Sequence, residues 1–328
     1  MTVSPDRIVG ALVGTAVGDA LGMPVEGLSH QNVRTYYLGI KEYRDDDQRG
    51  DLQAGQWTDD TQMTFALVRA MAQTADPEDW PAAVAEEYVA FRSEARRWGP
   101  TTTAAIDRLA NGAAPADSGN ADRATDGAAM RAAPLGLWWA AAEVSRARAF
   151  EVARAVLGVT HRHPVALVAG WGQAAAVWFA LGETPDTFDR AGFWATLLDA
   201  TTEAEEHLGA EPRVSDRLRA LEDQIDGFPL DLRDACDGVT VRADEAWPFA
   251  CAMVARRPHL LENTLLSGIN VGGDADTTGA MMGALLGALH GWDAVPTEWK
   301  EGLEATDRLV EEAQALAEAF SHTRRSND

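Results

Sequence analysis

Cysteine, lysine and strand-like patterns are all scarce in this sequence. Cys236 and Cys251 are the only cysteines, and they lack the CxxC spacing of a zinc or redox site, so we expect reduced thiols rather than a disulfide. Lys41 and Lys300 are the only lysines, and the formal net charge is −23. Such a chain is poorly suited to bind a nucleic-acid backbone, which requires clustered basic side chains. The acidic balance is compatible with cation binding and equally with a solvated acidic surface.

Long hydrophobic runs and linkers are also missing. No apolar run approaches the roughly 20 residues that span a bilayer. The first residues, MTVSPDRIVGALVG, lack the basic region and small-residue cleavage site of a signal peptide. We therefore predict a cytoplasmic protein without membrane contact. Because no stretch rich in Pro, Gly or Ser divides the 328 residues, we predict one domain over 1–328, with a core over about 5–295 and a C-terminal helical extension over 296–328.

Helical periodicity dominates what is present. Apolar residues recur at helical spacing in nearly every segment, whereas alternating β-branched residues are limited to short pieces such as 238–243. We predict an all-α fold, a compact bundle of many helices. The polar stretch 31–56 is expected to be an exposed loop, and the chain after residue 296 is expected to form either two amphipathic helices or one long helix.

Two of the expected helices carry a glycine at every fourth position. Residues four apart lie on one helix face, so each helix presents a stripe without side chains where a neighbour can approach closely. A glycine inside a helix costs about 1 kcal/mol relative to alanine, and close packing would offset this cost. The two helices are therefore expected to be central in the bundle. Their stripes consist of Gly10, Gly14, Gly18 and Gly22, and of Gly279, Gly283, Gly287 and Gly291.

Two helix starts combine paired carboxylates with threonine. A single acid or threonine at such a place is readily explained as a cap that also complements the helix dipole. A cap needs only one side-chain oxygen, however, and the remaining carboxylates would repel one another without a cation. Carboxylate and hydroxyl oxygens are ligands of Mg²⁺ and Mn²⁺, and the absence of His and Cys from both motifs disfavours Zn²⁺. The candidate ligands are Thr58, Asp59 and Asp60 in WTDDTQ, and Asp274, Asp276 and Thr277 in GGDADTTG.

Two further acids stand near the end of the first glycine helix, in the stretch GDALGMPVEG. Asp19 lies inside an otherwise apolar helix, and Glu26 follows a Met-Pro break. Alone, such a pattern would be a turn with an exposed acid. Beside the two carboxylate clusters, Glu26 becomes a candidate general base or an acid that supports the site.

These motifs together resemble the ADP-ribosylglycohydrolase family, which includes dinitrogenase-reductase-activating glycohydrolases and hydrolases of ADP-ribosyl-arginine and ADP-ribosyl-serine. The resemblance extends to about Gly291 and is carried, in order, by GDALGMPVEG, WTDDTQM, DGAAMRAAPLGLW, THRHPVAL and NVGGDADTTGAMMGALLGALHG. It implies an all-α orthogonal bundle with two Mg²⁺ or Mn²⁺ ions at the bottom of a cleft. The implied reaction is hydrolysis of the glycosidic bond between ADP-ribose and its acceptor, which is a protein side chain or a small molecule.

The resemblance also assigns roles to residues. The six candidate ligands would hold the metals, and Glu26, Asp60 and Asp276 would be catalytic. Glu26 would lie near the scissile ribose, and its role as acid or base stays open. A substrate-binding loop and one histidine would bind ADP-ribose, with His163 a weaker candidate. These substrate-binding residues are Asp126, Gly127, Ala128, Met130 and His161.

One position departs from the family pattern. The family commonly has Gly-Asn-Gly where this chain has Thr125-Asp126-Gly127. A carboxylate beside a diphosphate is unfavourable unless it faces away or binds a ribose hydroxyl. Other functions therefore stay open: an N-glycosidase acting on a nucleoside or related riboside, a phosphoester hydrolase on the same metal scaffold, and a non-catalytic ADP-ribose binder.

Overall fold

The computed structural model describes residues 3–325, and within this range it contains 17 α-helices and no β-sheet, which confirms the predicted all-α fold. Three short 3₁₀ turns, η1 (Met23–Val25), η2 (Arg92–Glu94) and η3 (Asp126–Ala128), interrupt the helices. The α-helices are α1 (Pro5–Gly22), α2 (His30–Tyr37), α3 (Asp59–Gln73), α4 (Trp80–Ala90), α5 (Pro100–Ala110), α6 (Pro115–Ser118), α7 (Ala133–Ala142), α8 (Arg146–Leu157), α9 (Pro164–Ala180), α10 (Arg190–Leu208), α11 (Arg213–Glu222), α12 (Pro229–Ala235), α13 (Ala243–Arg256), α14 (Leu261–Ile269), α15 (Ala275–His290), α16 (Thr297–Gly302) and α17 (Thr306–Arg325).

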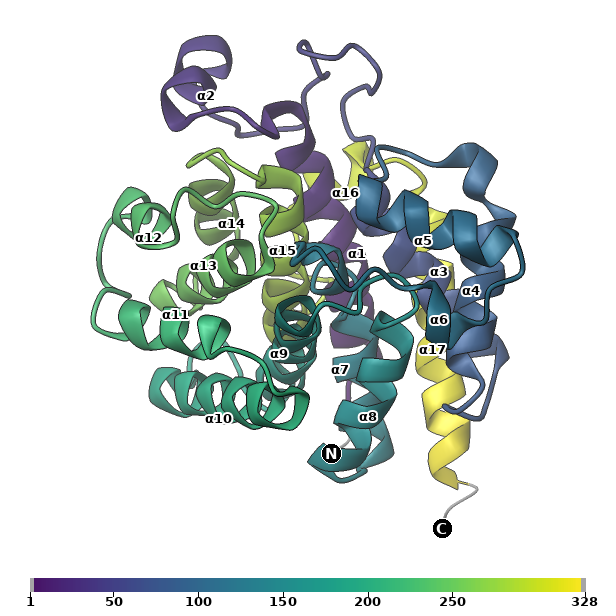
Figure 1. The fold of residues 1–328 in the computed structure, drawn as a ribbon. Helices are drawn as coiled ribbons and strands as arrows, with labels where there is room; N and C mark the ends of the chain where they lie inside the picture. The colour runs from purple at the N-terminus through teal and green to yellow at the C-terminus, as the bar shows by residue number, and fades with distance from the viewer. Residues whose placement is uncertain (1–2, 326–328) are drawn as a thin grey trace.

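The glycine helices α1 and α15 lie side by side at the centre of the molecule (Figure 1). Their stripes face each other with the backbones in contact. A Cβ on Gly14 would lie 2.5 Å from the carbonyl oxygen of Gly283, and a Cβ on Gly18 would lie 1.9 Å from that of Gly279. No side chain fits between the two helices at these points. The prediction that the two stripes place their helices at the centre of the bundle is confirmed.

The remaining helices cover this central pair on both sides. Helices α9, α13 and α14 pack against α15, whereas α3 and α17 pack against α1. In Figure 1 α13 and α14 lie to the left of the pair, α9 is drawn below the α15 label, and α3 and α17 lie to the right. The hydrophobic core includes large buried side chains such as Trp194, Trp247 and Phe249. The arrangement leaves the N-terminal ends of α3 and α15 close together.

Three segments were expected to have a particular local structure, and the outcomes differ. Segment 31–56 is not wholly a loop, because residues His30–Tyr37 form α2, whose start Ser29 caps by accepting a hydrogen bond from the Asn32 N–H at 3.3 Å. After residue 296 the chain forms two helices, α16 and α17, which is the first of the two expected arrangements. The strand-like stretch 238–243 forms no strand, but its Arg242 makes an isolated β-bridge with Thr125.

The expectation about hydrophobic runs was wrong. Residues Pro5–Val25 form a segment of 21 residues with a mean hydropathy of 1.6, long and apolar enough to cross a membrane. The apolar window of this segment is entirely buried inside the protein, where its glycines contact α15. The segment is therefore the core helix of the bundle. Cys236 and Cys251 are both buried and unpaired, as expected for reduced thiols.

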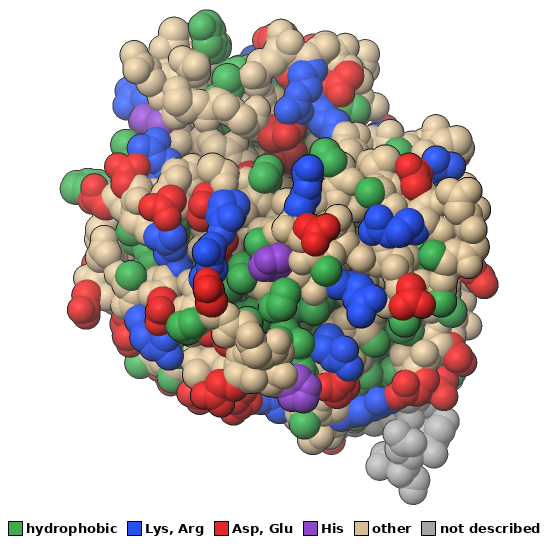
Figure 2. All heavy atoms as spheres, in the orientation of Figure 1, with side chains coloured by type: hydrophobic (Ala, Val, Ile, Leu, Met, Phe, Trp, Pro, Cys, Tyr) green, Lys and Arg blue, Asp and Glu red, His purple; other side chains and the backbone are tan. Residues whose placement is uncertain are grey.

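Charged side chains of both signs cover the face of the molecule shown in Figure 2. Acidic side chains gather along the lower rim of this face, and Lys and Arg side chains lie over its middle. The net charge of −23 thus coexists with a face on which basic groups are prominent.

Candidate metal and substrate site

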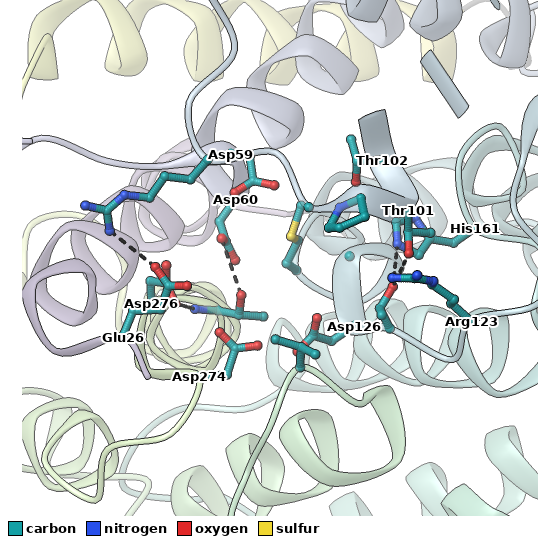
Figure 3. A pocket seen from close by; sticks show the side chains of 18 residues that line it. Glu26, Asp59, Asp60, Thr101, Thr102, Arg123, Asp126, His161, Asp274 and Asp276 are labelled. Carbon is teal, nitrogen blue, oxygen red and sulfur yellow. Dashed lines mark hydrogen bonds and ion pairs between the residues drawn. The ribbon is translucent and has the colours of Figure 1, made fainter. Parts of the chain in front are cut away.

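One pocket gathers nearly all the predicted site residues. It lies where the starts of α3 and α15 meet Glu26 and η3, and its cavity has a volume of about 180 Å³. Figure 3 shows Asp59, Asp60 and Glu26 on one side, Thr101, His161 and Arg123 on the other, and Asp126 between them. The pocket therefore has an acidic side and a side of hydroxyl, imidazole and guanidinium groups. Its acidic lining consists of Glu26, Asp59, Asp60, Asp126, Asp274 and Asp276.

Asp19, an acid in α1, accepts hydrogen bonds from the first residues of α3 and its N-cap. The Asp19 carboxylate accepts hydrogen bonds from the backbone N–H groups of Thr58 and Thr61, both at 3.0 Å, and from their hydroxyls at 2.9 and 2.6 Å. Backbone N–H groups at a helix start lack partners within the helix. Thr58 occupies the N-cap position, as expected, but its side chain accepts no capping hydrogen bond. The fully buried Asp19 caps α3 instead and thereby orients Asp59 and Asp60.

Asp60 stands between the two helix starts. Its Oδ2 lies 3.1 Å from the hydroxyl oxygen of Thr58 and 3.4 Å from that of Thr277, which belongs to α15. Its Oδ1 is buried and has no hydrogen-bond partner in the described part of the chain. A buried carboxylate oxygen without a partner is costly, and a divalent cation would satisfy it. Among the six predicted ligands, Thr58 alone does not line the pocket and lies behind Asp60.

The start of α15 is held by a glycine turn. Gly272 and Gly273 have φ values of 77° and 78°, which glycine adopts without strain. A Cβ on Gly273 would lie 2.3 Å from the carbonyl oxygen of Val239. Gly27 N–H donates to the Gly273 carbonyl at 2.7 Å, and Asp274 N–H donates to the Val239 carbonyl at 2.9 Å. The turn thus ties the start of α15 both to the chain after η1 and to the stretch 238–243.

Glu26 joins the acids of α15 and is also paired with arginine. One oxygen each of Glu26, Asp274 and Asp276 lie within 4.8 Å of one another, a grouping that could hold a metal ion. Glu26 forms ion pairs with Arg49 and with Arg97, the latter at 3.2 Å. Burial by itself would raise the pKa of Glu26, but the hydrogen bonds and charge of Arg49, with the charge of Arg97, lower it overall. The arginines therefore favour the ionised form of Glu26.

Four other carboxylates of the pocket lie close together and form no such ion pair in the described part of the chain. The ion pairs around the pocket go to Glu26, Asp46 and Asp51 rather than to these four. Burial, followed by repulsion between neighbouring carboxylates, raises the pKa of each of them well above its ordinary value. Such a cluster is stabilised by a cation, which removes both the desolvation cost and the repulsion. The four are Asp59, Asp60, Asp274 and Asp276.

The loop of η3 forms the wall opposite the acids. Gly127 lies against the ring of His161, because a Cβ at this position would be 2.6 Å from the His161 Cε1 atom. The ring nitrogens of His161 lie 3.0 Å from the hydroxyl oxygen of Thr125 and 2.8 Å from that of Thr160. Burial, and then the charge of Arg131, lower the pKa of His161 well below its ordinary value. Near neutral pH the His161 ring is therefore uncharged, with one nitrogen that donates a hydrogen bond and one that accepts.

The other residues of the predicted substrate side divide into two groups. Gly127, Met130 and His161 line the pocket, whereas Ala128 is buried and does not. The weaker candidate His163 does not line it either, because its Nδ1 accepts a hydrogen bond from the Val165 N–H at the start of α9, at 3.2 Å.

Several arginines shape the site without having been singled out in the sequence. The fully buried Arg131 donates to the Gly127 carbonyl and, at 3.2 Å, to the Leu157 carbonyl, so it holds the η3 loop from behind. Arg97 and Arg123 line the pocket itself. Arg131 falls inside the motif DGAAMRAAPLGLW, but nothing in that stretch distinguishes a buried arginine from an exposed one.

Comparison with known proteins agrees with this geometry. The family model of the ADP-ribosylglycohydrolases matches residues 2–326. An uncharacterised protein of Archaeoglobus fulgidus is 33% identical over 317 residues, which cover 95% of this chain and 96% of that protein. The ADP-ribosyl-[dinitrogen reductase] glycohydrolase of Rhodospirillum rubrum is 29% identical over 304 residues, covering 91% and 90% of the two chains. A solved structure described as an ADP-ribosylglycohydrolase-related protein complex superposes with a TM-score of 0.75 at 27% identity, covering 96% of this chain and 98% of the other. The chain therefore belongs to the ADP-ribosylglycohydrolase family and is a hydrolase of the glycosidase type.

Proposed function

We propose that this chain hydrolyses, with two Mg²⁺ or Mn²⁺ ions, the C1″ glycosidic bond that links ADP-ribose to an acceptor. The acceptor is a side chain of an ADP-ribosylated protein or a small ADP-ribosyl compound, and the enzyme acts in the cytoplasm. The observation that carries the proposal is the convergence of carboxylates from α3 and α15 around Asp60, whose buried Oδ1 has no partner among residues 3–325. The similarity to the Rhodospirillum rubrum enzyme, whose name specifies an ADP-ribosylated protein as substrate, supports the substrate class.

The donor set fits divalent cations that prefer oxygen. The candidate ligands offer only carboxylate and hydroxyl groups, and four of the carboxylates lack a cationic partner, so two divalent ions would balance their charge. Bound there, the ions would supply Lewis acidity to the ribose hydroxyls and to a water molecule. The proposed ligands are Thr58, Asp59, Asp60, Asp274, Asp276 and Thr277.

The chain's own groups would perform the rest of the reaction. Glu26 lies beside Asp276, and its lowered pKa favours its ionised form. Both features support a role for Glu26 as the base that accepts a proton from water. The carboxylates of Asp60 and Asp276 would offset the positive charge that develops at C1″ in an oxocarbenium-like transition state. On the opposite wall, the absence of a side chain at Gly127 leaves room for the neutral ring of His161, which lines the pocket and would contact the substrate.

The proposal is tested by incubating the purified protein with ADP-ribosyl-arginine and ADP-ribosyl-serine peptides and measuring released ADP-ribose. We expect release with Mg²⁺ or Mn²⁺ and none with EDTA. Asp60→Asn and Asp276→Asn should each lower the rate by at least about 100-fold and weaken metal binding. Asp216→Asn, which alters an exposed acid on α11, is the matched control and should behave as the wild type.

Three outcomes would contradict the proposal in different ways. Near wild-type release in EDTA would remove the role of the metals. Turnover of nucleosides without turnover of either peptide would favour the N-glycosidase. Binding of ADP-ribose without release from any substrate would identify a non-catalytic binder.

A further inference from the structure

Asp126 occupies a rigid and nearly closed position in the pocket. Its backbone N–H donates to the Val241 carbonyl at 3.1 Å, and its own carbonyl accepts from Ala129 N–H at 2.7 Å and Met130 N–H at 3.1 Å. The residue is 5% exposed, so its carboxylate cannot turn out to bulk water. The backbone thus determines which way the Asp126 side chain points.

The same short stretch, residues 239–241, holds both Asp126 and Asp274. Val241 accepts the N–H of Asp126, and Val239, two residues earlier, accepts the N–H of Asp274. The two side chains are in hydrogen-bonding contact with each other. Two ionised carboxylates are both acceptors, so this contact requires either a proton shared between them or a cation that binds both groups.

The Oδ2 atom of Asp126 is buried and has no hydrogen-bond partner among the described residues. The charged groups with the largest effect on Asp126 are acidic, namely Asp60, Asp274 and Asp276. A buried anion surrounded by anions is strongly disfavoured unless a cation is bound. Figure 3 shows Asp126 between the acids and His161, so it extends the acidic side toward the substrate wall.

We propose that Asp126 is an additional metal ligand in this chain, binding one divalent cation together with Asp274. The inference rests on the proposed metal dependence. It accounts for the departure from the Gly-Asn-Gly pattern, since a carboxylate bound to a cation does not repel a diphosphate. The diphosphate would then bind on the side of the pocket that carries Thr101 and Arg123.

The test compares the wild type with Asp126→Asn, an isosteric change to the residue that the family commonly has. Mn²⁺ binding is measured without substrate by isothermal titration calorimetry and by electron paramagnetic resonance. We expect the affinity of one Mn²⁺ site to fall by about tenfold or more. The metal-free variant should unfold at the same temperature as the wild type or at a higher one, because a buried charge has been removed. Asp126→Ala, which removes both oxygens, should weaken the site further.

The control variant is Asp122→Asn, an exposed acid four residues earlier, which should leave Mn²⁺ binding unchanged. Equal Mn²⁺ affinity and stoichiometry in the wild type and Asp126→Asn would overturn the inference and leave the proposed function intact. So would a loss confined to ADP-ribose affinity at saturating Mn²⁺, since Asp126 would then contact substrate. A wild type that binds no Mn²⁺ would overturn the inference together with the proposed metal dependence.

Discussion

Gly18→Ala tests whether the backbone contact between α1 and α15 is essential. The added Cβ would lie 1.9 Å from the carbonyl oxygen of Gly279 and 2.3 Å from its carbonyl carbon. Since ordinary contact begins at 3.4 Å, the helices must separate locally by about 1.5 Å. Alanine gains at most about 1 kcal/mol in helix propensity, whereas overpacking costs about 1–3 kcal/mol or more. Both clashing atoms belong to backbone, which cannot rotate away, so we expect a cost at the upper end of this range and a net loss of about 2 kcal/mol.

The free energy of unfolding from urea titration measures this loss. Gly99→Ala is the control for stability, because a Cβ there meets nothing within 4 Å and its φ is −63°. Gly18 is next to Asp19, and Gly279 follows Asp276 by three residues, so separation of the helices should also weaken Mn²⁺ binding. A Gly18→Ala protein as stable as Gly99→Ala, with wild-type Mn²⁺ affinity, would refute the reasoning.

Three further predictions concern the acids and their partners. Asp19→Ala removes the cap of α3 and leaves the N–H groups of Thr58 and Thr61 buried without acceptors, so we expect a loss of roughly 2–4 kcal/mol in urea unfolding; unchanged stability would contradict this. Burial, partly offset by hydrogen bonds from both threonines, raises the pKa of Asp19 to about 6. The native state then holds more protons than the unfolded state between about pH 4 and 6, so this group's contribution to metal-free stability falls as pH rises through that window. The pKa values of four further carboxyls are also raised, those of Asp59, Asp60, Asp274 and Asp276. Because Mn²⁺ binds the deprotonated carboxylates, the increase in melting temperature caused by Mn²⁺ should grow from pH 5 to pH 8. An increase independent of pH would count against a carboxylate site. Arg97→Gln removes the ion pairs to Glu26, Asp46 and Asp51, so amide hydrogen exchange in residues 45–51 should become faster, and unchanged exchange would show that other contacts hold this loop.

Local pattern was sufficient for the all-α fold class and for its central pair of helices, although it missed α2. Apolar spacing predicted an all-α chain because helical periodicity is a property of neighbouring residues. The glycine stripes predicted that α1 and α15 are central, because residues four apart necessarily share a face. Of the site residues that the motifs named, the pocket gathers all except Thr58, Ala128 and His163. Arg97 and Arg123 also line it and were not singled out.

Pattern was not sufficient where the partner of a group is distant in the chain. Asp19 caps a helix whose N-cap residue, Thr58, stands at a sequence separation of 39. Glu26 meets Arg49 at a sequence separation of 23 and Arg97 at a separation of 71, and these contacts, that of Arg49 above all, favour its ionised form. From the sequence we expected no apolar run long enough to span a membrane, yet the α1 segment is long and apolar enough. The complete burial of its apolar window is visible only in the folded protein.

Asp126 shows the same division within one residue. The sequence determined that a carboxylate stands where the family commonly has asparagine, and so raised the question of how it tolerates a diphosphate. Only the tertiary structure decided which way it faces, because the stretch 239–241 fixes Asp126 and Asp274 through its carbonyls. Residue type and periodicity are set by the order of the chain. Burial, charge pairing and the direction of a side chain are set by groups that folding brings from elsewhere, and these decide which carboxylates can share a cation.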